Sequence, residues 1–179
     1  ESEGFRDAVD AVFSGLEGTD FSSLSRFQVI AAADYLRHLL NKDGRHSIFT
    51  AGTGSGKSLA FQLAVIMKLA ISKVTGTDTG QAYAFVFPRV ALAIDQNNSL
   101  RSLCKEVNRA LYDGGHIEGT DDGINVILDS GSKLNEQAHR YYGQPKKEWE
   151  GEEKYASVHD AQNYVFSMGD KAPHIVVTN

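Results

Sequence analysis

Apolar residues recur at helical spacing through the first part of the chain. In residues 4–16 they stand on one predicted helix face: Phe5, Val9, Val12, Phe13 and Leu16. A polar linker, residues 17–23, follows. A second helix is predicted to begin at Ser25, because Ser25 and Gln28 have the spacing of a capping box, in which each side chain bonds to the other residue's backbone amide. Its expected apolar face comprises Phe27, Ile30, Ala31, Leu36 and Leu39 or Leu40, and it ends near residues 41–44.

Beyond this second helix the pattern changes to short apolar runs separated by a longer apolar stretch. Residues 47–50 are β-prone, and residues 83–87 form a continuous apolar run that stops at Pro88, which is typical of a buried parallel strand. Between them, residues 57–72 are almost entirely apolar. They predict a helix that is buried against a sheet.

The second half of the chain continues the alternation of helices and strands. A long helix is predicted over residues 90–111, and strands over residues 124–128 and 175–178. The helix carries its apolar residues on one side: Leu92, Leu100, Leu103, Val107 and Leu111. Strands that alternate with helices predict an α/β fold with a parallel sheet and helices on both faces. A helical segment and linker, residues 1–24, precede this domain.

A charged segment, residues 130–173, separates the last two predicted strands. Its acidic block stands beside two lysines: Glu148, Glu150, Glu152 and Glu153 beside Lys146 and Lys147. A segment of this length and charge between core strands predicts a surface insertion. Two short helices, near residues 133–141 and 158–167, are expected inside it.

Composition and charge narrow the class of protein. The chain has 179 residues, of which 41 % are apolar and 23 % charged, the ordinary mix of one globular domain. Its net charge of −5 arises after residue 90, so the chain lacks the basic balance of a bulk nucleic-acid binder. No apolar run is as long as a membrane span, no signal peptide is recognisable, and the single Cys104 fits a reducing compartment. We expect a cytoplasmic protein without a membrane contact, and the six histidines show no metal-ligand spacing.

Residues 51–58 read Ala-Gly-Thr-Gly-Ser-Gly-Lys-Ser, the pattern of a phosphate-binding loop between a strand and a helix. Its glycines let backbone N–H groups turn toward a polyphosphate, and the start of the next helix favours an anion. Lys57 supplies a positive charge to the β- and γ-phosphates of ATP, and Ser58 offers a hydroxyl to Mg²⁺. ATP and Mg²⁺ are therefore the expected cofactors, with Lys57 and Ser58 as catalytic residues. The expected nucleotide contacts are Gly52, Thr53, Gly54, Ser55, Gly56, Lys57 and Ser58.

The loop and three further segments resemble superfamily 2 helicases, in the same order along the chain. The loop headed by Ala51 resembles motif I, residues 87–96 (Phe-Pro-Arg-Val-Ala-Leu-Ala-Ile-Asp-Gln) resemble motif Ia, and residues 174–179 (His-Ile-Val-Val-Thr-Asn) resemble motif Ic. Gln28 stands upstream like the Q-motif glutamine that reads adenine, or it serves only the capping box, and the sequence leaves both open. The end of the motif Ia segment is closer to the Lhr- and MrfA-type DNA helicases than to DEAD-box proteins.

This resemblance implies the first RecA-like motor domain, residues 25–179, of an ATP-dependent DNA helicase or translocase. In such a domain Arg89, Thr178 and Asn179 contact the DNA backbone. Their alternative roles are structural, Arg89 as a helix-start residue and the other two as strand-end caps. The family's Asp-Glu pair and second RecA-like domain would follow residue 179, so these residues alone are expected to bind ATP and hydrolyse almost none. DNA repair or defence against phage is implied as the setting, with room for a partner subunit.

Two other classes of protein stay open. Asp129 ends an apolar strand and could be a loose Walker B carboxylate on Mg²⁺, which would make the chain a small P-loop kinase or NTPase. It is followed by Ser130 and Gly131 rather than by a second acid. A nucleotide-binding module without hydrolysis is the third reading. The sequence beyond residue 179 would distinguish these classes.

Overall fold

The computed structural model describes residues 3–19, 21, 23–41, 47–52, 54–77, 82–87, 89–128 and 174–178. The chain forms two compact units. The first comprises Glu1–Thr79 and Leu100–Ile124, and the second comprises Gly80–Ser99 and Asn125–Asn179. Each unit is described separately below.

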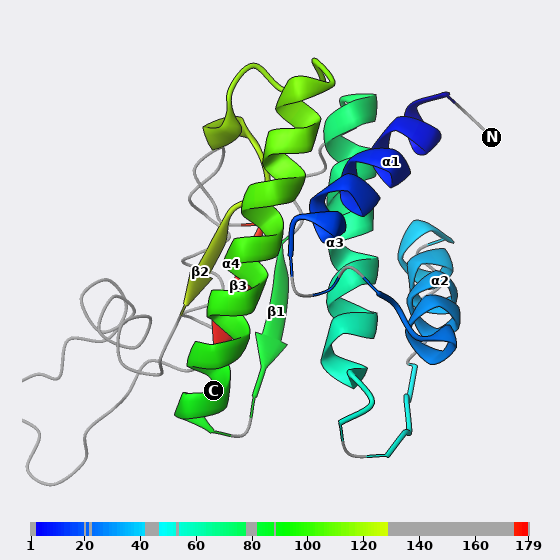
Figure 1. The fold of residues 1–179 in the computed structure, drawn as a ribbon, viewed down its shortest axis with the longest axis vertical. Helices are drawn as coiled ribbons and strands as arrows, with labels where there is room; N and C mark the ends of the chain where they lie inside the picture. The colour runs from blue at the N-terminus through cyan, green and yellow to red at the C-terminus, as the bar shows by residue number, and fades with distance from the viewer. Residues whose placement is uncertain are drawn as a thin grey trace, which may run out of the picture. The chain divides into compact units, whose positions relative to one another are not determined.

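The first unit is built around one apolar helix. Its helices are α1 (Glu3–Glu17), α2 (Arg26–Asn41), α3 (Lys57–Thr75) and the part of α4 (Val90–Asp113) from Leu100 onward. Figure 1 shows α1 and α2 against α3, and both helices contact it. α3 is long and apolar enough to cross a membrane, but 67 % of its most apolar window is buried inside the protein, as in the core helix of a globular domain.

The end of α3 is fixed by a glycine cap. Gly76 has a φ of 63°, in the left-handed region, and its N–H donates to the carbonyl of Lys73. The N–H of Thr77 donates to the carbonyl of Ser72 at 3.0 Å. Together these bonds form a Schellman motif, which satisfies carbonyl groups that the helix itself leaves without a donor.

Polar side chains as well as apolar ones secure the first unit. Asn108, on α4, is 7 % exposed and pairs with both backbone groups of Ile124. Its Nδ2 donates to the Ile124 carbonyl at 3.1 Å, and its Oδ1 accepts from the Ile124 N–H at 2.7 Å. The 3-10 helix η1 (Thr120–Asp122) lies just before this contact. Asn108 thereby anchors the segment that follows α4 to the helix.

The second unit contains a small parallel sheet. Its strands are β1 (Tyr83–Val86), β2 (Val126–Leu128) and β3 (Ile175–Thr178), in the order β1-β3-β2. Ile175 of β3 pairs in register with Tyr83 of β1 and with Val126 of β2. The side chains of Ile175 and Val177 are completely buried, as expected for the central strand of a parallel sheet. The three downstream strands predicted from the sequence are therefore confirmed.

Several details of the sequence prediction are wrong. Residues 47–50 form no strand: Ile48 is 89 % exposed, and the ring of Phe49 contacts Tyr35 of α2 in an edge-to-face arrangement. On α2 the predicted core residue Ile30 is 56 % exposed, whereas Gln28 is buried. β1 is not buried on both faces, because Val86 is 69 % exposed. The helices predicted inside residues 130–173 lie outside the described residues.

Candidate nucleotide-binding site

The predicted phosphate-binding loop connects residues 47–50 to α3. Gly54 has a φ of 77° and Gly56 a φ of 69°, both in the left-handed region that glycine adopts without strain. Gly56 is also the N-cap of α3, and Lys57 is the first residue of the helix. The predicted change from loop to helix at Lys57 is therefore confirmed. Thr53, the third residue of the loop, lies outside the described residues.

Lys57 folds back over the first half of the loop. Its Nζ donates to the carbonyl oxygens of Ala51 at 2.8 Å and of Gly52 at 2.7 Å. The ammonium is therefore held by the backbone of the first half of the loop. A phosphate that entered there would offer stronger, charged acceptors for the same Nζ protons.

The side chains and amides of the loop match a phosphate rather than a cation. The ammonium of Lys57 and the first-turn N–H groups of α3 are donors, and Gly56 has no side chain with which to cap those N–H groups. The hydroxyl of Ser55 is buried, and among the described residues it has no hydrogen-bond partner. Buried polar atoms are normally paired, so this hydroxyl fits a site completed by a ligand. Ser58 adds one hydroxyl oxygen, and Mg²⁺ takes its other ligands from water and phosphates.

Gln28 connects α2 to this loop. Its Oε1 accepts from the Ser25 N–H at 2.8 Å, and the Gln28 N–H donates to Ser25 Oγ at 3.3 Å. These two bonds confirm the predicted capping box. The Nε2 of Gln28 also donates to the carbonyl of Gly56 at 3.2 Å, across 28 positions of sequence. The glutamine thus lies at the loop, as a nucleotide-contacting residue would.

Comparison with known proteins supplies the family. The family model of the DEAD/DEAH box helicase matches residues 28–147, which is more than half of the chain. This chain belongs to the DEAD/DEAH box helicase family. No curated protein and no solved structure matches the chain. The match begins at Gln28 and includes the loop, β1, α4 and β2.

Family membership gives the coarse function of the chain. A DEAD/DEAH box helicase domain is a nucleotide-binding motor with ATPase and helicase activity, typically uses ATP with Mg²⁺, and binds nucleic acid. Among the alternatives drawn from the sequence, this favours the helicase over a small kinase or a non-hydrolysing module. Asp129, on which the kinase alternative depends, lies outside the described residues.

Two of the residues predicted to contact nucleic acid stand at the carboxyl ends of neighbouring strands. Arg89 is exposed and lies just before α4, and its carbonyl accepts the Ala93 N–H at 3.0 Å, so its backbone does start this helix. Thr178 ends β3 and pairs in register with Val86, the last residue of β1. Parallel strands in register bring their carboxyl ends to one edge of the sheet. Arg89, three positions after β1, and Thr178, the last residue of β3, therefore stand at the carboxyl ends of neighbouring strands. Asn179 lies outside the described residues.

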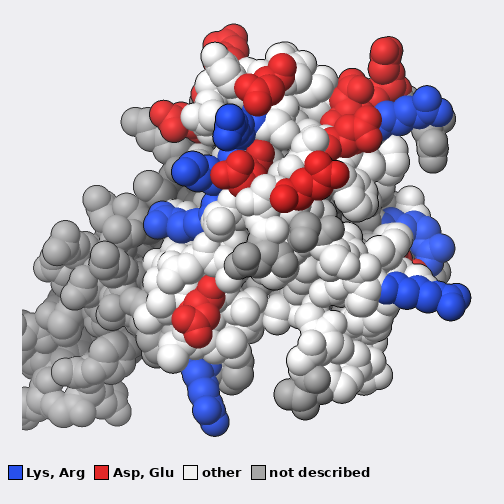
Figure 2. Space-filling model, in the orientation of Figure 1, with Lys and Arg blue, Asp and Glu red and all other residues white. Residues whose placement is uncertain are grey.

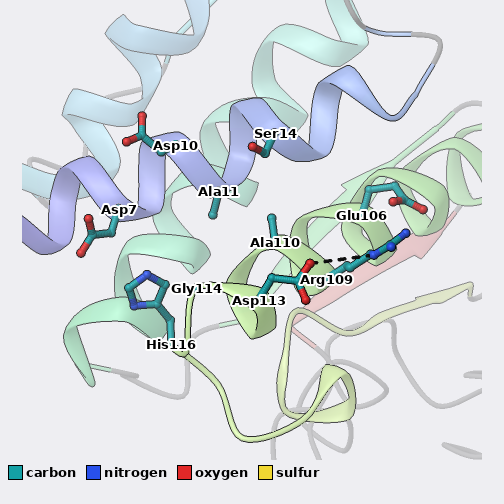
Figure 3. Close-up of a pocket in the computed structure, with 10 residues that line it drawn as sticks. All are labelled: Asp7, Asp10, Ala11, Ser14, Glu106, Arg109, Ala110, Asp113, Gly114 and His116. Atoms are coloured by element: carbon teal, nitrogen blue, oxygen red, sulfur yellow. Dashed lines mark ion pairs between the residues drawn. The ribbon is translucent and has the colours of Figure 1, made fainter.

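A cavity in the first unit does not suit a phosphate. It is a cavity of about 470 Å³ with walls from α1, the end of α4 and the turn after it, seen in Figure 3. Its charged and titratable side chains are Asp7, Asp10, Glu106, Arg109, Asp113 and His116. Arg109 pairs with Asp113 at 3.9 Å. Figure 2 shows acidic side chains gathered over the same two helices, which would repel a polyphosphate.

Proposed function

We propose that this chain is the ATP-binding part of a DNA helicase or translocase motor, with ATP and Mg²⁺ held on Gly52–Ser58. Lys57 donates hydrogen bonds to the β- and γ-phosphates, the Ser58 hydroxyl is a ligand of Mg²⁺, and Thr53 is a further nucleotide contact. The observation that carries this proposal is the loop's donor set. Three features meet on one short loop: the ammonium of Lys57, the start of α3 without a side-chain cap, and the hydroxyl of Ser55, which has no partner within the described part of the chain.

Calorimetric titration with ATP and Mg²⁺ tests the nucleotide site. Lys57→Ala should weaken binding by a factor of roughly ten or more, because it removes charge-assisted hydrogen bonds to the phosphates. Lys105→Ala is the matched control, since Lys105 is an exposed lysine on α4. Equal affinity of wild type and Lys57→Ala, or no binding by the wild type, would refute the site.

We propose DNA as the nucleic acid, contacted through Arg89, Thr178 and Asn179. The choice of DNA rests on the likeness of residues 87–96 and 174–179 to the Lhr- and MrfA-type helicases. The net charge of −5 implies that the contacts are local and few. Fluorescence titration of the protein with labelled DNA and RNA of the same sequence tests this choice. Equal or tighter binding of the RNA strand would contradict it.

The wider assignment follows from the same likeness. We propose that residues 25–179 act with a second RecA-like domain, and with a partner subunit, in cytoplasmic DNA repair or phage defence. The helical segment before residue 25 packs on α3 in the first unit, so it contributes to the stability of the motor domain. Survival of cells that carry a Lys57→Ala gene, after DNA damage and after phage infection, distinguishes the two settings.

A further inference from the structure

The helix α2 carries large apolar side chains on the side that points away from α3. It packs on α3 through its opposite side, where Ala31 and Ala32 are buried (Figure 1). On the outward side Val29 is 47 % exposed, Ile30 56 % and Leu40 40 %. Apolar residues scattered singly over a surface are ordinary, but several gathered on one exposed face mark an interaction surface.

The outward apolar residues have the spacing of a coiled-coil seam. Val29, Ala33, Leu36 and Leu40 follow one another at intervals of four, three and four residues, and all are exposed except Leu36, which is half-buried. This spacing keeps side chains on one line along a helix, and its usual complement is a second helix that lies alongside. Ile30 widens the line on one side. We call these five residues the outer face of α2.

Two arginines stand along the outer face of α2. Arg26 and Arg37 are exposed and eleven positions apart, which is about 16 Å along the helix axis. Arg26 forms no ion pair with any residue that the structure describes. Arg37 pairs with Asp34, the one acid of α2, but both side chains are exposed and a guanidinium has donors for a second carboxylate. The outer face of α2 is therefore apolar with a positive charge toward each end.

We propose that the outer face of α2 docks an acidic helix of a partner protein. The apolar stripe of that helix lies against the outer face, and its carboxylates lie beside Arg26 and Arg37. Complementary charges at two separated points fix the direction and register of the bound helix. This role goes beyond nucleotide and nucleic-acid binding and depends on neither.

Charge makes other occupants a poorer match for this face. If α2 of a second copy crossed it antiparallel at Ala33, Arg26 of one copy would lie only about 5 Å along the axis from Arg37 of the other. In a parallel pair each arginine would face its own counterpart, and opposed like charges disfavour association. A helix that lies on an anionic membrane is rich in Lys and Arg on its polar side, whereas α2 has two arginines in a chain of net charge −5.

Selection from a display library of helical peptides tests the proposal on the full chain. The peptides share an apolar stripe with the four-three-four spacing, and their flanking positions vary among Glu, Lys, Gln and Ser. Selection on the wild type should enrich Glu at the flanking positions. Selection on the double variant Arg26→Glu/Arg37→Glu should enrich Lys instead. Loss of folding would abolish binding and cannot reverse the charge preference, so a reversal reports on the surface itself.

The affinity of a selected acidic peptide locates the contact. Ile30→Glu should weaken its binding by roughly tenfold or more, because the new carboxylate stands in the apolar face opposite the acids of the peptide. Ile94→Glu is the matched control, since Ile94 on α4 is 39 % exposed and the same change there should leave the affinity unchanged. Equal affinities of wild type and Ile30→Glu, or equal losses in both variants, would overturn the proposal.

Other results overturn the acidic partner in distinct ways. Enrichment of Lys, or of no charge, on the wild type removes the charge complementarity. A wild-type dimer in sedimentation velocity that Ile30→Glu dissociates assigns the face to a second copy. Binding to phosphatidylserine vesicles that Ile30→Glu abolishes assigns it to a membrane. Titration of ATP into the same variants should give wild-type affinity, so a failure of the nucleotide site is recognised separately.

Discussion

Gly15 of α1 lies against Val107 of α4 with no room for a further carbon atom. A Cβ at Gly15 would stand 2.6 Å from Val107 Cγ2 and 2.8 Å from the Val107 backbone nitrogen. The second of these neighbours is main chain, so it cannot move aside as a flexible side chain would. The approach of the two helices therefore depends on glycine at this position.

Gly15→Ala should lower the free energy of unfolding by roughly 1–3 kcal/mol. Overpacking of a close contact costs this much or more, and the gain of about 1 kcal/mol in helix propensity offsets only part of it. Gly18→Ala is the control, because its Cβ would meet no atom closer than 3.5 Å. Urea denaturation followed by circular dichroism measures both, and equal stability of the two variants would contradict the proposed close packing.

Asn108→Ala should destabilise the first unit by about 2–4 kcal/mol, because it leaves the N–H and C=O of Ile124 without their partner in a buried setting. Asn98→Ala, at an exposed position of the same helix, should change the unfolding free energy by less than about 0.5 kcal/mol. The same denaturation experiment applies. Asn108→Asp keeps the acceptor and loses the donor, so it should also be destabilised.

Ser55→Ala should have opposite effects on stability and on binding. It removes a buried hydroxyl that has no partner among the described residues, so the ligand-free protein should gain up to about 1 kcal/mol. Affinity for ATP should fall, because the proposed phosphate site loses a donor. Ser72→Ala is the contrasting variant, since the Ser72 hydroxyl donates to the Lys68 carbonyl at 3.1 Å and its removal should destabilise. Thermal unfolding without ATP measures the change in stability, and the increase in unfolding temperature on adding ATP measures the change in affinity.

Cys104 should be unreactive in the folded protein. Burial raises the pKa of its thiol from 9.0 to about 12, so the thiolate that reacts with iodoacetamide is almost absent at pH 8. Because the folded pKa is the higher one, the thiol's contribution to stability is complete below pH 9 and is lost as the pH rises toward 12. Wild type should therefore lose stability over this range more steeply than Cys104→Ala. Native alkylation at pH 8 as fast as that of the urea-unfolded chain would contradict the burial.

Arg89→Ala should weaken binding of labelled single-stranded DNA about equally for every sequence. It should also lower the slope of log affinity against log salt concentration by roughly one, the release of one counterion. Thr178→Val should weaken binding without a change in slope, because the hydroxyl carries no charge. Arg6→Ala removes the same charge from an exposed position on α1 and serves as the control. If Arg89→Ala binds with wild-type affinity and slope, Arg89 only starts α4.

Local signals in the sequence predicted those parts of the fold that depend on neighbouring residues. The glycine pattern and Lys57 marked the loop and the start of α3, and Ser25 with Gln28 marked the start of α2. Periodicity was misleading on α2, because it weighs apolarity alone: Ile30 is exposed, while Gln28 is buried with its polar groups bonded.

Contacts between distant segments had no signal in the sequence. The bond from Gln28 to Gly56 spans 28 positions, and although the resemblance to helicases offered Gln28 as a nucleotide contact, no local pattern predicts the bond itself. The β-prone residues 47–50 have the composition of a strand, but a strand exists only when a neighbour supplies its hydrogen bonds. The close contact of Gly15 with Val107 likewise depends on the path of the whole chain.

The order β1-β3-β2 sets the sequence of events in which the sheet can form. Both outer strands pair with β3, which comes after them in the chain. During synthesis β1 and β2 therefore have no partner strand in this sheet until residues 175–178 have left the ribosome. Ile175 pairs with Val126 and Tyr83, which lie 49 and 92 positions earlier in the chain, so the sheet closes contacts between distant residues, a slow step compared with the local contacts of helices. The helical unit can fold first. Until β3 is available, the unpaired strands β1 and β2 are prone to incorrect pairing.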